Sequence, residues 1–259
     1  MRENHFKTKL AAGQPCVSGW VQTADPLVAE VMAHTGFDAL TFDLQHGIAD
    51  LGDVVGLLQA ASGTRTTPLV RVRWNDPDQI MRVLDMGAYG VICPMIDSAD
   101  DARSFVAACR YPPQGIRSFG PVRGLLYGGP DYAAHANDTI STIAMIETRS
   151  ALEQVDAIAA VPGLDAVFVG PADLSQALGG PPGSDWTSGP VREALDVVVR
   201  SCAAQGIPAG IFTKDAAYAA AMLDRGFGFV TVGSDLGYVT SGARQALDGV
   251  RRRLAGEEA

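Results

Sequence analysis

The chain has 259 residues, of which 47% are hydrophobic and 19% are charged, and its formal net charge is −9. This length and composition predict a single α/β domain, 1–259, whose core is large enough to need no disulfides. The acidic balance excludes nucleic acid and anionic membranes as expected partners, because both require a basic face. The sequence shows no apolar secretory stretch, no bilayer-spanning run and no clustered cysteines, so we expect a cytoplasmic protein.

Short β-rich runs alternate with amphipathic stretches along the whole sequence. The predicted strands are residues 17–22, 39–44, 69–74, 90–95, 142–147, 166–170, 209–212 and 229–232. The predicted helices between them are residues 26–34, 49–61, 77–86, 99–109, 150–160, 190–205 and 215–225. Eight strand–helix units in about 250 residues are typical of a (β/α)₈ TIM barrel. A doubly wound open sheet would show fewer strands and a GxGxxG turn after the first one.

Two segments interrupt this alternation. Residues 111–140 form a long insertion rich in Pro, Gly and Tyr, and residues 179–189 read GGPPGSDWTSG. Long loops inside a compact domain are usually functional or locally folded. We therefore expect parts of them, residues 117–127 and 179–186, to lie against the substrate, partly from another subunit.

Charged residues follow four of the predicted strands, at the end of a barrel where catalytic groups lie. These residues are Asp43 with His46, then Arg71, Glu147 and Asp173. Two carboxylates from separate strands offer hard oxygen ligands to Mg²⁺ or Mn²⁺. The histidine could move a proton near neutral pH, and the arginine could stabilise an oxyanion. The pattern predicts a metal site for an anionic substrate.

The segment Gly170-Pro171-Ala172 turns from the sixth predicted strand into a helix. The first amides of that helix could bind a substrate carboxylate, because helix N-termini attract anions, and a glycine permits close approach.

Each charged residue also has a structural interpretation. Glu147 could begin a helix, Asp173 could be a helix N-cap, and Asp43 with His46 could form a hydrogen-bonded structural pair. Either arginine of the third predicted strand could hold a barrel carboxylate. A functional site is favoured because all of these residues fall at strand ends.

Lysine is scarce in the predicted barrel. The only lysine after the first predicted strand is Lys214. It follows the seventh predicted strand, which is not one of the four that carry the charged residues. A Schiff-base aldolase requires a lysine nucleophile. A metal ion is therefore favoured as the electrophile.

Six motifs in order, FDLQHG, PLVRVRWNDP, GAYGVICPM, CRYPPQGIRSFGP, AMIETR and VFVGPADLS, occur within residues 19–235. Together they resemble the 4-hydroxy-2-oxoheptanedioate (2,4-dihydroxyhept-2-ene-1,7-dioate) aldolases, which are class II pyruvate aldolases. AMIETR with GIRSFGP is most similar to the hydroxyketoacid aldolases of that family. The resemblance implies reversible cleavage of 4-hydroxy-2-oxoacids to pyruvate or hydroxypyruvate and an aldehyde. It also implies a phosphoenolpyruvate/pyruvate-type barrel with a swapped C-terminal helix, a homohexamer built as a dimer of trimers, and a divalent cofactor, Mg²⁺, Mn²⁺ or Co²⁺.

The resemblance also implies roles for individual residues. Glu147 and Asp173 match the metal ligands, His46 the catalytic base, Asp43 its acidic companion, and Arg71 the residue that contacts the pyruvyl oxygen.

Four further matches concern the walls of the site. Gly170 and Ala172 match the loop that seats the substrate carboxylate, and Trp20 matches a pocket aromatic. Asp85 is a weaker candidate for orienting the catalytic histidine, including from a neighbouring subunit.

The sequence departs from the family pattern at Met145 and Gln45, where many members have Gln and Glu. These changes put the namesake's dicarboxylate substrate in doubt. Two other functions stay open. One is a malyl- or citramalyl-CoA-type lyase, which would need additional basic residues for the CoA phosphates. The other is a non-catalytic metal-dependent binding barrel, which would need no catalytic base.

Overall fold

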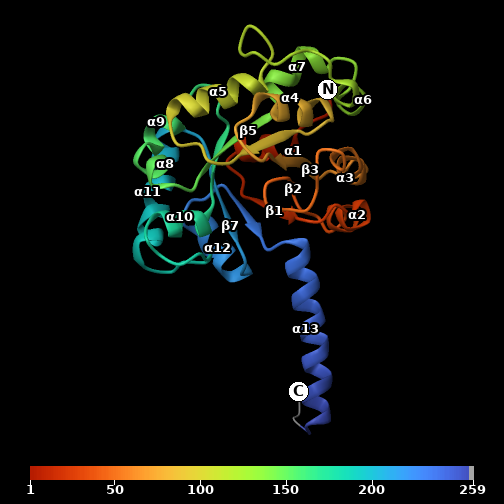
Figure 1. Cartoon of the computed structure of the whole chain (residues 1–259), viewed down its shortest axis with the longest axis vertical. Helices are drawn as coiled ribbons and strands as arrows, with labels where there is room; N and C mark the ends of the chain where they lie inside the picture. Colours follow the sequence, from red (N-terminus) through yellow and green to blue (C-terminus); the bar gives the residue numbers. More distant parts are fainter. Residues whose placement is uncertain (257–259) are drawn as a thin grey trace.

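The structure, a computed structural model that describes residues 1–256, is a closed barrel of eight parallel strands paired in sequential order (Figure 1). The strands are β1 (Cys16–Val21), β2 (Ala39–Asp43), β3 (Thr67–Arg71), β4 (Gly90–Cys93), β5 (Ser141–Ile146), β6 (Ala166–Val169), β7 (Ala209–Thr213) and β8 (Phe229–Val232). The predicted (β/α)₈ barrel is confirmed, and every predicted strand overlaps an observed one. The last three residues of the predicted domain lie outside the described residues.

Thirteen helices accompany the strands within residues 1–256. They are α1 (His5–Ala11), α2 (Pro26–Ala33), α3 (Val54–Ala61), α4 (Pro77–Asp85), α5 (Ala99–Cys109), α6 (Val122–Gly128), α7 (Tyr132–Thr139), α8 (Arg149–Glu153), α9 (Val155–Ala159), α10 (Pro171–Ala177), α11 (Gly189–Gln205), α12 (Ala216–Asp224) and α13 (Asp235–Leu254). The predicted helix 150–160 is divided into α8 and α9 around Gln154, which ends one and precedes the other. The short α10 directly follows β6, where the sequence predicts a turn into a helix.

The interior of the barrel is filled by an aromatic column. Phe6, from α1, packs edge-on against Phe229 with ring centroids 5.2 Å apart. Phe229 stacks on Phe168 at 5.6 Å, and Phe168 stacks on Trp20 at 5.7 Å. Gly210 on β7 leaves room for this column, because a Cβ there would lie 2.1 Å from the Phe229 ring. The column supports the carboxyl-terminal end of the barrel from below.

The insertion 111–140 lies on the side of the barrel where the strands begin, because it connects a helix, α5, to a strand, β5. Arg117 is only 1% exposed, donates to Asp85 at 2.8 Å and lies over the Tyr111 ring at 4.4 Å. The amide of Arg2 donates to the carbonyl of Gly128 at 2.7 Å. The expectation that 117–127 contacts the substrate is therefore wrong within one chain, where this segment packs on α4 and the N-terminal segment.

Helix α13 projects away from the barrel (Figure 1). Its first residue, Asp235, is buried and accepts hydrogen bonds from the amides of Gln22 and Thr23, both at 3.0 Å. Beyond this anchor, α13 exposes a run of apolar side chains, which includes Leu247 and Val250. No helix within residues 1–256 has the length and apolar character needed to cross a bilayer.

A partly buried ionic cluster joins α1 to the amino-terminal ends of β5 and β6. Asp165 accepts from Arg110 at 3.0 Å and from the amide of Thr142 at 2.9 Å, and pairs with Lys7 at 2.9 Å. Burial lowers the pKa of Lys7, although the charge of Asp165 opposes that shift. The carboxylate of Asp165 thus compensates two cations that have little access to water.

We predict that Asp165→Asn lowers the free energy of unfolding by about 2–3 kcal/mol, because it leaves Arg110 and Lys7 without a counter-ion. Urea denaturation followed by circular dichroism measures the change. The control is Glu193→Gln, which neutralises an exposed carboxylate on α11 and should change stability by less than about 0.5 kcal/mol. Equal stability of the two variants would contradict the prediction.

Candidate active site

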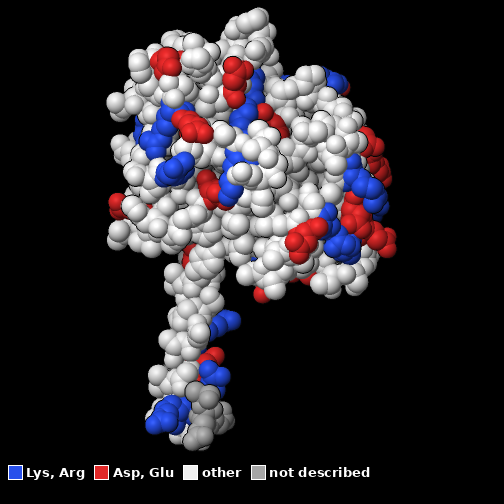
Figure 2. Space-filling model, turned by 180° about the vertical axis from the view of Figure 1, so that it is seen from behind, with Lys and Arg blue, Asp and Glu red and all other residues white. Residues whose placement is uncertain are grey.

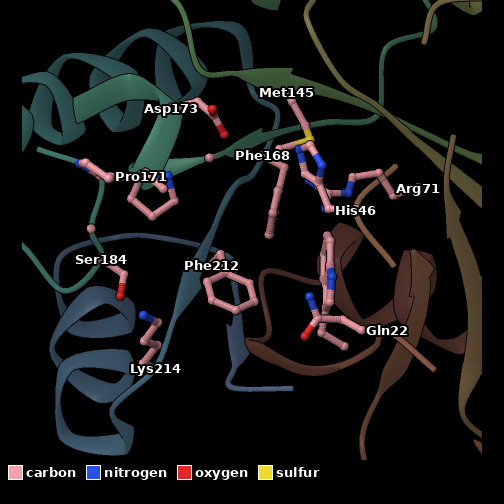
Figure 3. A pocket seen from close by; sticks show the side chains of 15 residues that line it. Gln22, His46, Arg71, Met145, Phe168, Pro171, Asp173, Ser184, Phe212 and Lys214 are labelled. Carbon is pink, nitrogen blue, oxygen red and sulfur yellow. The ribbon is translucent and has the colours of Figure 1, made fainter. Parts of the chain in front are cut away.

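A cavity of about 320 Å³ opens at the carboxyl ends of the strands (Figure 3). Seven of the residues predicted for the site line it: Trp20, His46, Arg71, Gly170, Pro171, Ala172 and Asp173. The rest of the lining consists of Gln22, Met145, Phe168, Pro182, Gly183, Ser184, Phe212 and Lys214. Pro182, Gly183 and Ser184 belong to the loop 179–186 that was expected to lie against the substrate. The sequence therefore identifies the correct end of the barrel and ten of the fifteen lining residues.

A buried ion pair forms the base of the cavity. Arg71, the last residue of β3, is 7% exposed, and Asp43, the last residue of β2, is fully buried. The guanidinium Nε and Nη2 donate to the two carboxylate oxygens at 2.8 and 2.6 Å. Burial alone would raise the pKa of Asp43, but the hydrogen bonds and charge of Arg71 outweigh it and the pKa lies below its ordinary value.

The same carboxylate organises the turn that carries His46. Asp43 accepts from the amides of Gln45 and His46 at 3.0 and 3.3 Å, and from the indole of Trp20 at 3.2 Å. His46 then extends from an exposed position to the cavity. Asp43 lies next to His46 as predicted, but its recorded bond is to the main chain of that residue and not to the imidazole ring.

Glu147 follows β5 and is only 2% exposed. Its Oε1 accepts from the amide of Met95 at 2.8 Å. Burial, with a further contribution from the charge of Asp173, raises the pKa of Glu147 to about 7, although the Met95 hydrogen bond opposes the shift. Near neutral pH this carboxyl is therefore divided between its protonated and ionised forms, and a positive charge beside it would favour the ionised form.

Gly170 separates the two predicted metal ligands in sequence and allows them to approach. A Cβ on Gly170 would lie 2.6 Å from Oε2 of Glu147, so any other residue would displace that carboxylate. The glycine precedes α10, whose first turn contains Asp173. The second carboxylate is thereby held on a helix that begins at the edge of the cavity.

These two carboxylates fit a divalent cation. Within residues 1–256 no group of three or more His, Cys, Asp or Glu side chains is arranged to hold a metal. Glu147 and Asp173 would then be the side-chain ligands, and water and substrate oxygens would complete the shell, as Mg²⁺ sites with one or two carboxylates do. A cation here would also offset the free-energy cost of burying the ionised carboxylate of Glu147.

Arg71 and Arg73 are two residues apart but have different surroundings. Arg73 is exposed and pairs with Asp50 outside the cavity, whereas Arg71 lies 4.8 Å above the Trp20 ring inside it. The structure therefore places only the first arginine in the site.

Asp85 does not reach the cavity within one chain. It is the last residue of α4 and pairs with Arg117 at 2.8 Å. Its predicted effect on His46 requires a neighbouring subunit and stays a prediction.

The sequence analysis missed two aromatic walls, Phe168 and Phe212. Both belong to predicted strands, where successive side chains point alternately into and out of the barrel. That alternation could have identified them as residues that face the interior. Met145, one of the two departures from the family pattern, lies in the cavity wall, whereas the other, Gln45, does not line it.

The fold and the site define a (β/α)₈ barrel with a cavity at the carboxyl ends of its strands that is lined by an arginine, a histidine and a carboxylate. Residues 17–241 match the family described as HpcH/HpaI aldolase/citrate lyase, and the chain belongs to that family.

Known relatives cover nearly the whole chain. The chain is 40% identical over 248 residues to a hydroxypyruvate/pyruvate aldolase of Rhizorhabdus wittichii, covering 96% of this chain and 99% of the relative. It is 39% identical over 263 residues to a 4-hydroxy-2-oxo-heptane-1,7-dioate aldolase of Salmonella newport, covering 98% of each. A crystal structure of a family member from Burkholderia cenocepacia J2315 superposes with a TM-score of 0.90 at 33% identity, over 96% of this chain and 99% of that one. The resemblance inferred from the motifs is confirmed.

The raised pKa of Glu147 predicts how stability depends on pH and metal. Without a cation, the folded state keeps this proton up to about pH 7, while the unfolded state loses it near its ordinary value of 4.5. Folding stability should therefore fall as the pH rises through this window, by about 3 kcal/mol for this group. Added Mn²⁺ should raise the melting temperature at pH 8 and have little effect at pH 5.

Thermal unfolding with and without Mn²⁺, followed by circular dichroism at both pH values, measures this effect. Glu147→Gln should remove the Mn²⁺ shift at pH 8 and weaken the pH dependence, and Glu193→Gln is the matched control. A Mn²⁺ shift of the same size in Glu147→Gln would exclude Glu147 as a ligand.

Proposed function

We propose that this protein is a divalent-metal-dependent class II aldolase that reversibly cleaves 4-hydroxy-2-oxoacids to pyruvate or hydroxypyruvate and an aldehyde. The observation that carries the proposal is that Arg71 and Asp173 line one cavity, with the buried carboxylate of Glu147 directly behind Gly170 in its wall. The names of the family relatives support the same reaction class. Mg²⁺, Mn²⁺ and Co²⁺ are the proposed ions.

The chain's own groups bind and orient the 2-oxoacid. Its carboxylate lies at the first amides of α10, from Ala172 and Asp173, where the helix dipole favours an anion. Its 2-oxo group lies toward Arg71, whose guanidinium is held in place by the pair with Asp43. A divalent ion bound by the two carboxylates supplies Lewis acidity toward the 2-oxo and carboxylate oxygens.

His46 performs the proton transfer. Its imidazole accepts the proton of the C4 hydroxyl, the C4–O bond becomes the aldehyde carbonyl, and the C3–C4 bond breaks. The electron pair of that bond passes to C3 and the 2-oxo oxygen as an enolate, which Arg71 stabilises by charge and hydrogen bonding. Return of a proton to C3 gives pyruvate.

We predict that Arg71→Ala reduces enolate formation at least about a hundredfold, because one charged donor to an oxyanion contributes about that much. The measurement is proton–deuterium exchange at C3 of pyruvate, followed by NMR with Mn²⁺ or Mg²⁺ present. Arg73→Ala, which removes an exposed arginine two residues away, is the matched control and should exchange at the wild-type rate. Exchange by Arg71→Ala at the wild-type rate would remove this arginine from the mechanism, and exchange that persists in EDTA would refute the metal.

We further propose that the protein forms a homo-oligomer through α13, in a hexamer built as a dimer of trimers with a swapped C-terminal helix. Large apolar side chains are exposed in both halves of this helix, at Leu236 and Val239 and again, three or four positions apart, at Leu247, Val250 and Leu254. Figure 2 shows charged residues on the far half of this helix, with a largely uncharged stretch between them and the barrel. An apolar stripe on a projecting helix needs a covering surface, and a second copy supplies one. A cytoplasmic location is part of this proposal and agrees with four free, buried cysteines.

We predict that Leu247→Asp lowers the molar mass in solution, because it places a charge in the apolar stripe of α13. Light scattering coupled to size-exclusion chromatography measures the mass against the 27.1 kDa chain. Gln245→Asp adds the same charge at an exposed polar position of the helix and should leave the mass unchanged. A wild-type protein that elutes as a single chain would contradict the proposed assembly.

A further inference from the structure

The cavity has a second charged group that the mechanism above does not use. Lys214 follows β7 and lines the cavity wall, and its side chain is exposed. Among the ion pairs formed within residues 1–256, none involves Lys214. The cavity therefore has a lysine ammonium in its wall that is not neutralised by a carboxylate.

Lys214 is held beside the loop that follows α10. Asp185, with a positive φ of 59°, accepts from the amides of Lys214 and Asp215 at 3.0 and 2.9 Å. The Tyr218 hydroxyl donates to the carbonyl of Trp186 at 2.9 Å. The carboxylate of Asp185 is thus directed at the main chain, and the loop is fixed against the start of α12.

This arrangement brings Ser184 into the cavity next to Lys214. Figure 3 shows the two side chains on one side of the cavity, with Phe212 between them and Arg71. The only carboxylate among the lining residues is Asp173, which Figure 3 places on the side of Met145. The Lys214 side therefore offers an ammonium and a hydroxyl to a ligand, and no acidic side chain.

The position along the substrate follows from the rest of the site. The metal ligands, Arg71 and the first amides of α10 bind the 2-oxoacid part in the proposed function. Phe212 lies between Arg71 and Lys214 in the same cavity, so a substrate that extends past Phe212 would bring its aldehyde-derived end toward Lys214.

We propose that Lys214, with Ser184, forms a subsite for a terminal anionic group on the aldehyde, either a carboxylate or a phosphate. The inference rests on the proposed aldolase function and specifies the second substrate of that reaction. An ammonium has three donors and a full charge, and hydrogen bonds to charged groups are stronger than neutral ones. Lys214 is thereby a specificity-determining residue and takes no part in enolate formation.

The test compares matched aldehydes in the addition of pyruvate. D-glyceraldehyde 3-phosphate is compared with D-glyceraldehyde, and succinic semialdehyde with butanal, so each pair differs in one anionic group. Wild-type kcat/KM should favour at least one anionic member, and the pair that shows the preference distinguishes phosphate from carboxylate. Lys214→Gln should lower kcat/KM for that anionic aldehyde about tenfold and change its neutral partner less than about twofold. Lys214→Arg should restore most of the preference.

Two additional measurements separate the possible failures. Arg200→Gln removes an exposed charge from the far end of α11 and is the control for net charge. Wild-type kcat/KM for the anionic aldehyde should fall with ionic strength, while that for its neutral partner should not. Equal losses for both members of a pair, or no wild-type preference, would overturn the subsite.

Pyruvate C3 exchange distinguishes the subsite from the proposed function, because it requires no aldehyde. Absence of exchange in the wild type would refute the aldolase itself. Wild-type exchange that is lost in Lys214→Gln would assign the lysine to pyruvate activation and overturn the subsite. Reduction by borohydride of a pyruvate adduct at Lys214 would overturn it in the same way.

Discussion

The bidentate pair between Asp43 and Arg71 is the interaction on which the geometry of the site depends. The two residues face each other across the β2–β3 register, at the ends of adjacent strands. Burying two charges is unfavourable unless their hydrogen bonds are complete, and Asp43 also accepts from Trp20 and two amides. The pair fixes the guanidinium over the indole of Trp20, which rests on the aromatic column of the barrel. The pair therefore positions Arg71, the turn that carries His46 and the indole of Trp20 relative to one another.

The same pair explains why the site needs a cation. Arg71 is neutralised by Asp43, so the charges that remain near the 2-oxoacid are the carboxylates of Glu147 and Asp173. An anionic substrate would meet net repulsion there, and burial already raises the pKa of Glu147 to about 7. A divalent ion would neutralise the two carboxylates, remove the repulsion and favour their ionised forms. The charge balance of these residues thus supports the proposed metal independently of the chemistry.

Local patterns in the sequence were enough to predict the barrel and the strand ends that carry Asp43, Glu147 and Asp173. These patterns could not show which of Arg71 and Arg73 enters the site, because residues two apart lie on the same side of a strand. The difference arises because β3 ends at Arg71, so Arg73 lies beyond the strand. Segment 117–127 lies opposite the catalytic end of its own barrel, and the topology contained that signal, since it connects a helix to a strand. Its contact with a substrate in another subunit stays a prediction. The approach of Ser184 to Lys214 depends on the bonds of Asp185 to a distant loop, which no local pattern contains.

Met145 and Lys214 concern different ends of the same cavity. Met145 lies in the wall near Arg71, so its lack of a hydrogen-bonding amide changes the surroundings of the 2-oxoacid part (Figure 3). Lys214 lies beyond Phe212, where the aldehyde part is expected. With a cation on the two carboxylates, the 2-oxoacid end of the cavity would no longer repel an anion. The Lys214 end is positive, and the wall between the two ends includes aromatic side chains. In the proposed function, that distribution complements a substrate with anionic groups at its two ends. The two carboxylates fix the direction of the substrate, because only they would hold the ion that binds the 2-oxoacid.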